Sequence, residues 1–99
     1  MGRSGPHYRL SPRAEDDLQN IYGYTAETWS PPQAMRYHSM IVAALDDIAD
    51  RPAKGRAIDI RPGYMKYAVG SHVIFYRIAD DGIDVIRILH RRMDAETNL

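Results

Sequence analysis

The sequence SHVIFYRIADDGIDVIRILHRRMD, residues 71–94, decides the fold of this 99-residue chain. Two runs rich in β-branched and aromatic residues, 72–78 and 83–90, flank the segment ADDG, which predicts two strands joined by a tight turn. Both faces of the run 72–78 are apolar except at His72 and Arg77, as is typical of a central strand with one face on helices and the other only partly wet. The runs RAIDI (56–60) and YMKYAV (64–69) precede it, so an antiparallel meander is predicted.

Two amphipathic helices are predicted before these strands. Ser11 can cap a helix that begins at Pro12, and apolar positions from Ala14 to Trp29 then recur with a helical period. The sequence SPP at 30–32 must end this helix and begin a second one, which stops at DRPAKG, residues 50–55. Two helices joined this tightly form an antiparallel hairpin.

These elements together predict an α+β fold. A short amino-terminal strand, residues 7–11, leads into the helix hairpin, which packs on one face of a small antiparallel β-sheet in the order β-α-α-β-β-β, or β-α-α-β-β-β-β if all four runs after the helices form strands. The length fits one domain covering residues 1–99.

The composition restricts the chemistry. There is no cysteine, and the four histidines show no metal-ligand spacing, so neither a metal site nor a cofactor is expected. No apolar run is long enough to span a membrane, and the first ten residues lack the hydrophobic centre of a signal peptide. We therefore expect a cytoplasmic protein with no membrane partner.

The net charge of 0 conceals an asymmetry along the chain. Residues 13–50 hold two basic and seven acidic residues, a net of −5, whereas residues 51–99 hold nine basic and six acidic residues, a net of +3. Eleven of the 13 basic residues are arginines, which suits the recognition of carboxylates or phosphates, although a preference for arginine codons would give the same bias. A chain without net charge is not expected to bind nucleic acid directly and specifically.

No established catalytic motif is present. The glycine-containing turns match neither dinucleotide-binding nor P-loop sequences, and no nucleophile-and-base set is recognisable. A metal-independent ribonuclease would need a base, an acid and cations for the phosphorane-like transition state. The candidates are Lys66, Arg77, Arg87, Arg91 and Arg92 as cations, and Tyr64, Tyr67 and Tyr76 as acids. Arg77 and Arg87 could equally cover the wet face of the sheet.

Four features point to a known family: the order of elements, the two-helix segment SPRAEDDLQNIYGYTAETWSPPQAMRYHSMIVAALDDIADRP, the strand HVIFYRI and above all the ending VIRILHRRMD. In these features the chain resembles the ParE toxins of the ParE/RelE toxin–antitoxin superfamily. The resemblance extends from Tyr8 to about Asp94. It implies a small toxin that is neutralised by a ParD-type antitoxin and acts on DNA gyrase, so that cleaved DNA complexes accumulate.

The RelE-like branch of this superfamily, which cuts mRNA in the ribosome, fits less well. Where those toxins carry paired lysines, only Lys66 is present, and the expected arginine falls at or beside His72. The expected tyrosine falls near Thr97, and Arg91 is the one position that matches. We therefore expect a binding protein and not an enzyme, with a ribosome-dependent mRNA endoribonuclease or a non-toxic antitoxin-binding co-repressor as alternatives.

The resemblance also suggests two sets of site residues. The target-binding set, expected to be needed for toxicity, comprises His90, Arg91, Arg92, Met93 and Asp94. Alternatively, Arg91 and Arg92 only keep the end of a strand soluble. The antitoxin-binding set comprises Tyr22, Trp29, Tyr37, Met40, Arg61 and Tyr64, expected to contact an amphipathic helix and an extended segment. For Tyr22 and Trp29, however, a place in the core is expected in preference to contact with the antitoxin.

Overall fold

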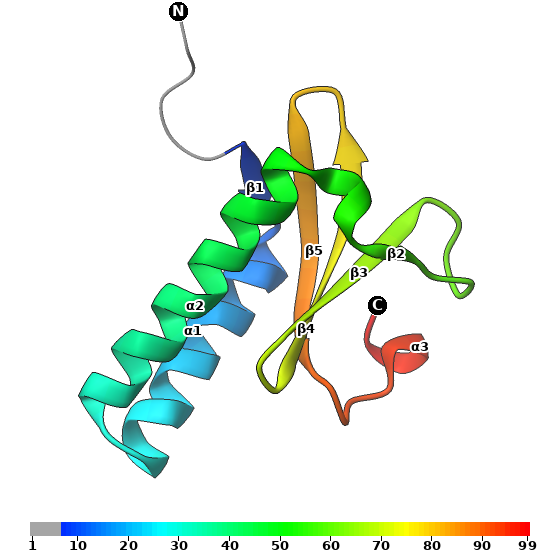
Figure 1. Ribbon diagram of the computed structural model, residues 1–99. Helices are drawn as coiled ribbons and strands as arrows, with labels where there is room; N and C mark the ends of the chain where they lie inside the picture. The colour runs from blue at the N-terminus through cyan, green and yellow to red at the C-terminus, as the bar shows by residue number, and fades with distance from the viewer. Residues whose placement is uncertain (1–6) are drawn as a thin grey trace, which may run out of the picture.

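The computed structural model describes residues 7–99 of the chain. In chain order the elements are β1 (Tyr8–Leu10), α1 (Pro12–Thr28), α2 (Pro31–Asp50), the 3-10 helix η1 (Pro52–Lys54), β2 (Arg56–Ala57), β3 (Tyr64–Val69), β4 (His72–Ala79), β5 (Gly82–His90) and α3 (Ala95–Asn98). The helices α1 and α2 lie side by side on one side of the sheet, and α3 lies on the other side (Figure 1). The predicted α+β class and the helix hairpin are confirmed.

The sheet has the strand order β1-β5-β4-β3-β2, so β4 is central, as predicted. The pairs β2–β3, β3–β4 and β4–β5 are antiparallel, but β1 pairs with β5 in the parallel direction. The sheet is therefore mixed and not purely antiparallel. No hairpin turn fixes the direction of β1, because the whole helix hairpin separates it from the other strands.

The predicted strand at 56–60 is shorter than expected. Strand β2 comprises only Arg56 and Ala57, and the amide of Ile58 donates to the carbonyl oxygen of Tyr64 in β3 at 3.0 Å. The chain then turns through Gly63, whose φ of 84° is a conformation that favours glycine. The amide of Tyr64 donates to the carbonyl oxygen of Arg61 at 3.1 Å within this turn. The short helix α3 was not expected from the sequence.

Both helix starts follow the predicted pattern. The hydroxyl of Ser11 accepts a hydrogen bond from the amide of Ala14 at 3.0 Å, and that of Ser30 accepts one from the amide of Gln33 at 3.2 Å. Proline occupies the first turn of each helix, where it lacks only an amide that would have no helical partner. Within residues 7–99, no helix is long and apolar enough to cross a membrane.

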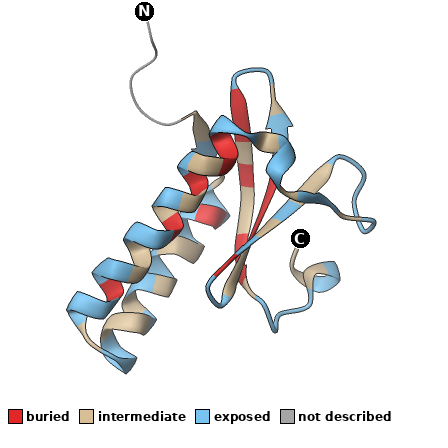
Figure 2. Ribbon diagram, in the orientation of Figure 1, coloured by how far each residue is buried: buried red, intermediate tan, exposed pale blue. Residues whose placement is uncertain are grey.

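The core lies between the helix hairpin and the sheet (Figure 2). Its fully buried side chains include Ile41, Leu45 and Ile48 of α2 and Ile74, Tyr76, Ile83 and Val85 of β4 and β5. The second face of the sheet is also partly covered, since Phe75 is 6% exposed and Leu89 is 2% exposed. This agrees with the prediction that the second face is only partly wet.

The prediction that Tyr22 and Trp29 lie in the core is wrong. Trp29 is 74% exposed because it caps the end of α1, at the tip of the helix hairpin and away from the sheet (Figure 1). Tyr22 is 37% exposed, and its ring lies edge-on against His38 of α2 with ring centroids 6.0 Å apart. Both side chains are therefore available to a partner.

Candidate functional site

A tight turn at residues 90–93 presents two arginines to solvent. The amide of Met93 donates to the carbonyl oxygen of His90 at 2.8 Å, which places Arg91 and Arg92 at the two central positions. The amide of Arg91 also donates to the carbonyl oxygen of Ser71 at 2.9 Å. Both arginines are exposed, and neither guanidinium forms an ion pair or hydrogen bond with any side chain in residues 7–99. The turn thus holds two free cations on a fixed backbone.

Asp94 has a structural role beside this turn. Its carboxylate accepts hydrogen bonds from the amide of Glu96 at 3.1 Å and from the hydroxyl of Thr97 at 2.9 Å, and it thereby caps α3. The main-chain oxygen of Asn98 accepts a hydrogen bond from Arg87 at 2.9 Å, and that of Leu99 accepts one from Arg61 at 2.8 Å. The segment after the turn is therefore tied back to the sheet.

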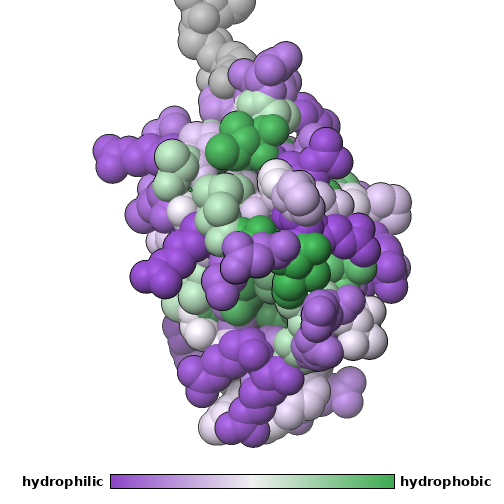
Figure 3. All heavy atoms as spheres, turned by 90° about the vertical axis from the view of Figure 1, so that its right-hand side faces the viewer, coloured by the Kyte–Doolittle hydropathy of each residue, from purple (hydrophilic) through white to green (hydrophobic). Residues whose placement is uncertain are grey.

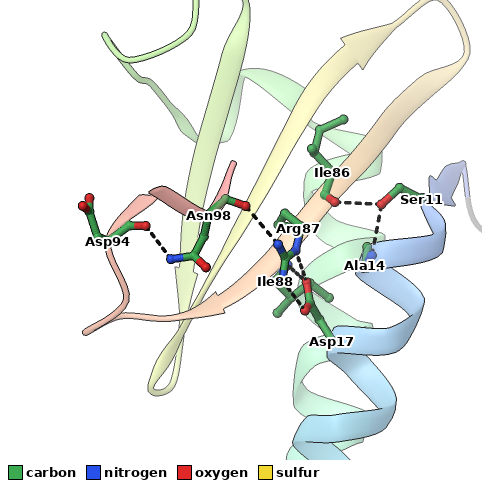
Figure 4. A network of polar contacts seen from close by, with 8 residues as sticks. All are labelled: Ser11, Ala14, Asp17, Ile86, Arg87, Ile88, Asp94 and Asn98. Carbon is green, nitrogen blue, oxygen red and sulfur yellow. Dashed lines mark hydrogen bonds and ion pairs between the residues drawn. The ribbon is translucent and has the colours of Figure 1, made fainter. Parts of the chain in front are cut away.

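Arg87 links this segment to the helix hairpin (Figure 4). Its Nε and Nη2 donate to the carboxylate of Asp17 at 2.8 Å each, and both side chains are only 12% exposed. The amide of Ile88 donates to the same carboxylate at 2.9 Å. The hydrogen bonds to Asp17 raise the pKa of the Arg87 guanidinium. This ion pair fixes α1 against the edge of β5 and, through Arg87, the carboxyl-terminal segment.

A cluster of Tyr37, Ser71, His72 and His90 lies on the other side of the turn. The Tyr37 hydroxyl accepts from the amide of Ser71 at 3.0 Å and lies 2.6 Å from Nδ1 of His72. The rings of His72 and His90 are edge-on at 5.3 Å, and Nδ1 of His90 accepts from the amide of Arg92 at 3.2 Å. Burial, and then the proximity of His90, lower the pKa of His72. The cluster connects α2 to the arginine turn.

Two adjoining cavities of about 440 and 360 Å³ lie beside this cluster and have the lining residues Tyr24, Thr25, His72 and His90 in common. The first also reaches Met93, and the second also reaches Trp29 and Tyr37. We call this feature the tip hollow, because it lies between the tip half of the helix hairpin and the end of β5.

The opposite face of the sheet has a further hollow of about 370 Å³, which shares the lining residues His90 and Met93 with the 440 Å³ cavity. Its lining includes Lys66, Phe75 and Arg91, together with residues of the loop between β2 and β3. Figure 3 views the molecule from this side and shows small apolar areas among mainly hydrophilic side chains. The arginine turn therefore lies between two hollows.

The proposed antitoxin-binding residues fall into three groups. Tyr22 lines an outer groove of about 360 Å³ with Leu10, Leu18 and His38. Trp29 and Tyr37 line the tip hollow, and Met40 lies with Tyr37 against the turn at Gly70. The Arg61 guanidinium lies over the ring of Tyr64, 5.8 Å from its centroid, near the edge of the sheet. A partner that contacts all three groups must extend around the molecule.

The candidate ribonuclease groups are only partly available. Tyr76 is fully buried, donates to the carbonyl oxygen of Pro52 at 2.6 Å, and has its pKa raised by burial, so it is unsuited to act as an acid. Arg87 is occupied by Asp17, whereas Lys66, Arg77, Arg91 and Arg92 remain exposed. Within residues 7–99, no cluster of three or more histidines and carboxylates could hold a metal ion.

Sequence reasoning missed the parts played by Asp17, Tyr24 and His72. Asp17 was not predicted as a site residue, although an acidic residue within a helix and an arginine within a strand could have suggested an ion pair. Tyr24 is 70% exposed. It lies outside the predicted apolar face of its helix, and a large aromatic residue at such a position is an indication of binding.

The structure is thus a helix hairpin on a small mixed sheet, with a tight turn that presents two arginines near exposed aromatic side chains. A model of the family described as "ParE toxin of type II toxin-antitoxin system, parDE" matches residues 8–95. The chain therefore belongs to the ParE toxin family of type II toxin–antitoxin systems.

Individual relatives agree with this assignment. The chain is 47% identical over 94 residues to Toxin ParE1 of Mycobacterium tuberculosis, covering 93% of this chain and 96% of the relative. It is 40% identical over 93 residues to Toxin ParE1 of Caulobacter vibrioides, with 93% and 96% covered. A chain of the chromosomal ParDE TA system from P. aeruginosa has the same fold, with a TM-score of 0.74 at 19% identity over 86% of this chain and 95% of that chain.

Proposed function

We propose that this ParE toxin inhibits DNA gyrase by binding and is neutralised by a ParD-type antitoxin in the cytoplasm. The observation that carries the proposal is the turn at residues 90–93, where Arg91 and Arg92 are exposed and unpaired by any described side chain. Free cations on a preorganised backbone suit the recognition of acidic groups on a protein or protein–DNA target, because little conformational freedom is lost on binding.

The neighbours of the turn support this proposal. His90 and Met93 flank the two arginines and line the tip hollow, so the target would meet both cations and an apolar surface. Asp94 contributes by capping α3, and the bonds from Arg61 and Arg87 hold the following residues in place. In the proposed target-binding set, His90, Arg91, Arg92 and Met93 therefore contact the target, and Asp94 positions them.

A mechanism by binding is favoured over catalysis. Tyr76 and Arg87, two of the candidate transition-state groups, are occupied by structural hydrogen bonds. Each missing acid or cation costs a ribonuclease about 10²- to 10⁴-fold in rate. Gyrase inhibition requires no such set, because a protein that stabilises one state of its target needs only differential affinity.

The antitoxin surface is proposed to run from the outer groove across α2 to the edge of the sheet. Tyr22, Trp29 and Met40 are exposed apolar side chains along this path, and Arg61 and Tyr64 lie at its end. Large apolar side chains exposed over three separate groups suit a partner that folds as it binds, with an amphipathic helix followed by an extended segment.

The test is a supercoiling and DNA-cleavage assay with purified gyrase, the full-length toxin, and the toxin with the antitoxin encoded beside it. We expect supercoiling to be inhibited and cleaved DNA to accumulate with toxin alone, and both effects to disappear when antitoxin is added in excess. Unchanged supercoiling by a toxin preparation that stops growth on induction would contradict the proposal.

One observation favours a second candidate function. Lys66 and Arg91 line the same hollow on the second face of the sheet, so two of the cations required by a ribosome-dependent mRNA endoribonuclease lie together. Mapping of cut sites in ribosome-bound mRNA after induction tests this candidate. A chain that neither stops growth nor cuts mRNA, but represses transcription with its antitoxin, would instead be a co-repressor.

A further inference from the structure

Two histidines lie side by side where the start of β4 meets the end of β5, next to the arginine turn at residues 90–93. His72 and His90 are a cross-strand pair, and their rings are edge-on with centroids 5.3 Å apart. The Tyr37 hydroxyl lies 2.6 Å from Nδ1 of His72, and the amide of Arg92 donates to Nδ1 of His90 at 3.2 Å. Contacts therefore run from α2 through both rings to the backbone of the turn.

The imidazole of His90 occupies a place that asparagine or aspartate takes in many turns. Those side chains commonly accept the amide two residues further along the chain. Of the three amides that follow His90, those of Arg91 and Met93 donate to carbonyl oxygens, whereas that of Arg92 donates to the imidazole. A side chain that titrates near neutral pH thus replaces one that does not.

The hydrogen bond from Arg92 exists only when Nδ1 of His90 carries no proton. A backbone amide is a donor, so the imidazole must present a lone pair, and a neutral His90 then carries its hydrogen on Nε2. A proton added to His90 occupies Nδ1 and places two N–H groups against each other. The amide of Arg92 then loses its acceptor.

His72 differs from His90, because its partner tolerates either state of the ring. The Tyr37 hydroxyl can donate to a neutral Nδ1 of His72 or accept from a protonated one, and the carbonyl oxygen of Val69 lies 3.5 Å away as a second acceptor. Burial, and then the proximity of His90, lower the pKa of His72. The first proton that the pair takes up therefore falls on His90, and the adjacent charge disfavours a second one.

Several charged or titratable side chains surround the two rings besides Tyr37. Those that share a cavity lining with His72 or His90 are Asp17, Tyr24, Asp59, Lys66, Arg87 and Arg91. Asp17 raises the pKa of His72, but it is the weakest of the three causes, and its charge is paired with Arg87. No other histidine of residues 7–99 lines these cavities, so the pair is the element that titrates near neutral pH.

We propose that His90 is a positioning residue of the arginine turn and makes it sensitive to protons: neutral His90 holds the Arg92 amide, and protonated His90 releases it and loosens the turn. The consequence for activity rests on the proposed function. Arg91 and Arg92 keep their charges in both states, but a loosened turn loses more conformational freedom when it binds its target. Affinity for the target should therefore fall as His90 takes up a proton.

NMR of the isotope-labelled full-length toxin measures the hydrogen bond itself. The readout is the protection of backbone amides from hydrogen exchange, relative to the unfolded chain at the same pH, at about pH 7.5 and about pH 5.5. We expect the protection of the Arg92 amide to fall by about fivefold or more at the lower pH. The Arg91 amide is the internal control, because it donates to the carbonyl oxygen of Ser71, which does not titrate.

Two variants assign the proton to one of the two rings. His90→Asn keeps an acceptor for the amide two residues further on but does not titrate, so its Arg92 amide should be equally protected at both pH values. His72→Gln removes the other imidazole and should leave the loss at Arg92 in place. Unchanged protection of Arg92 in the wild-type protein would overturn the inference. So would an equal loss at Arg91, a loss that persists in His90→Asn, or one that disappears in His72→Gln.

The consequence for the target is measured as the affinity of the toxin for purified gyrase at about pH 7.5 and about pH 6. Each protein is compared with itself, so a change in basal affinity caused by His90→Asn does not enter. The wild-type toxin should lose about threefold or more in affinity beyond any change seen for His90→Asn. Equal changes in the two proteins, or a gain in the wild-type toxin, would overturn this consequence. A toxin that binds gyrase at neither pH would refute the proposed target, and the NMR result would still decide whether His90 holds the turn.

Discussion

At the scale of single residues, Asp17 shows how one side chain can connect distant parts of the chain. Its carboxylate receives two hydrogen bonds from Arg87 and one from the amide of Ile88, and thereby joins α1 to β5. Among the ion pairs of residues 7–99, this pair alone is nearly buried, at 12% exposure for each side chain. Buried charges are tolerated in proteins when they are paired and hydrogen-bonded, as they are here.

Asp17→Asn should therefore lower the free energy of unfolding by about 2–3 kcal/mol, because the Arg87 guanidinium loses its anion while it stays largely buried. The measurement is urea unfolding followed by circular dichroism. Asp16→Asn is the control, since the neighbouring Asp16 is exposed and should contribute only a few tenths of a kcal/mol through the helix dipole. Equal effects of the two substitutions would contradict the account of Asp17.

His72 should make stability depend on pH. Burial and the nearby His90 lower the pKa of His72 in the folded protein, whereas Asp17 acts in the opposite direction and more weakly. The unfolded chain, with a histidine pKa of about 6.5, therefore binds the proton more readily. The stabilising contribution is complete above that value and is lost as the pH falls from it toward the lowered folded pKa.

Urea unfolding at about pH 7.5 and about pH 5.5 measures this contribution. The wild-type protein should lose more stability between the two conditions than His72→Gln, which keeps an acceptor for the Tyr37 hydroxyl but does not titrate. The same loss in both proteins would show that His72 does not control the change.

The residues of the site were only partly predictable. The resemblance indicated the arginines at the end of the last strand, and the structure shows Arg91 and Arg92 exposed there in a tight turn that was not predicted. The sequence did not indicate that Asp94 caps α3 or that Trp29 is exposed. Helical periodicity shows which side a residue faces, but not whether the neighbouring sheet extends far enough to cover it.

At the scale of elements, the tight connection between β4 and β5 depends on Gly82. Its φ of 145° lies in a region that other residues rarely adopt, and a Cβ at this position would overlap the carbonyl oxygen of His7. That oxygen accepts a hydrogen bond from the amide of Ile83 at 3.0 Å, which joins the residue before β1 to β5. Gly82 therefore allows β1 to dock on the sheet.

Gly82→Ala should destabilise the protein by more than about 1 kcal/mol, because it combines backbone strain with a steric clash. Gly23→Ala provides the opposite case. Gly23 lies inside α1 with no atom in the way of a Cβ, so alanine should stabilise by about 0.5–1 kcal/mol. Thermal unfolding of both variants checks the pair, and a stabilising Gly82→Ala would contradict the role assigned to the β4–β5 connection.

The elements themselves were mostly readable from the sequence. Serine caps and prolines marked both helix starts, and apolar runs marked β3, β4 and β5 within one or two residues. The parallel direction of β1 and the early end of β2 were not readable. Both depend on contacts with residues far away in the chain, which no local pattern encodes.

At the scale of the whole molecule, the fold separates two kinds of surface. The helix hairpin carries most of the acidic residues and the exposed aromatic side chains, whereas the chain after the hairpin, residues 51–99, carries nine of the 13 basic residues. The family assignment confirms the resemblance to ParE toxins. The tip hollow, where the two surfaces meet, could not be predicted, because it is formed by three segments separated in sequence.

The most direct test of the central claim is a gyrase DNA-cleavage assay with the double variant Arg91→Ala/Arg92→Ala. We expect the toxin concentration that produces half-maximal cleavage to rise by about tenfold or more, because the target loses both free cations. Arg56→Ala, an exposed arginine at the edge of the sheet, is the control and should act like the wild-type protein. Undiminished cleavage by the double variant would contradict the claim that the arginine turn binds the target.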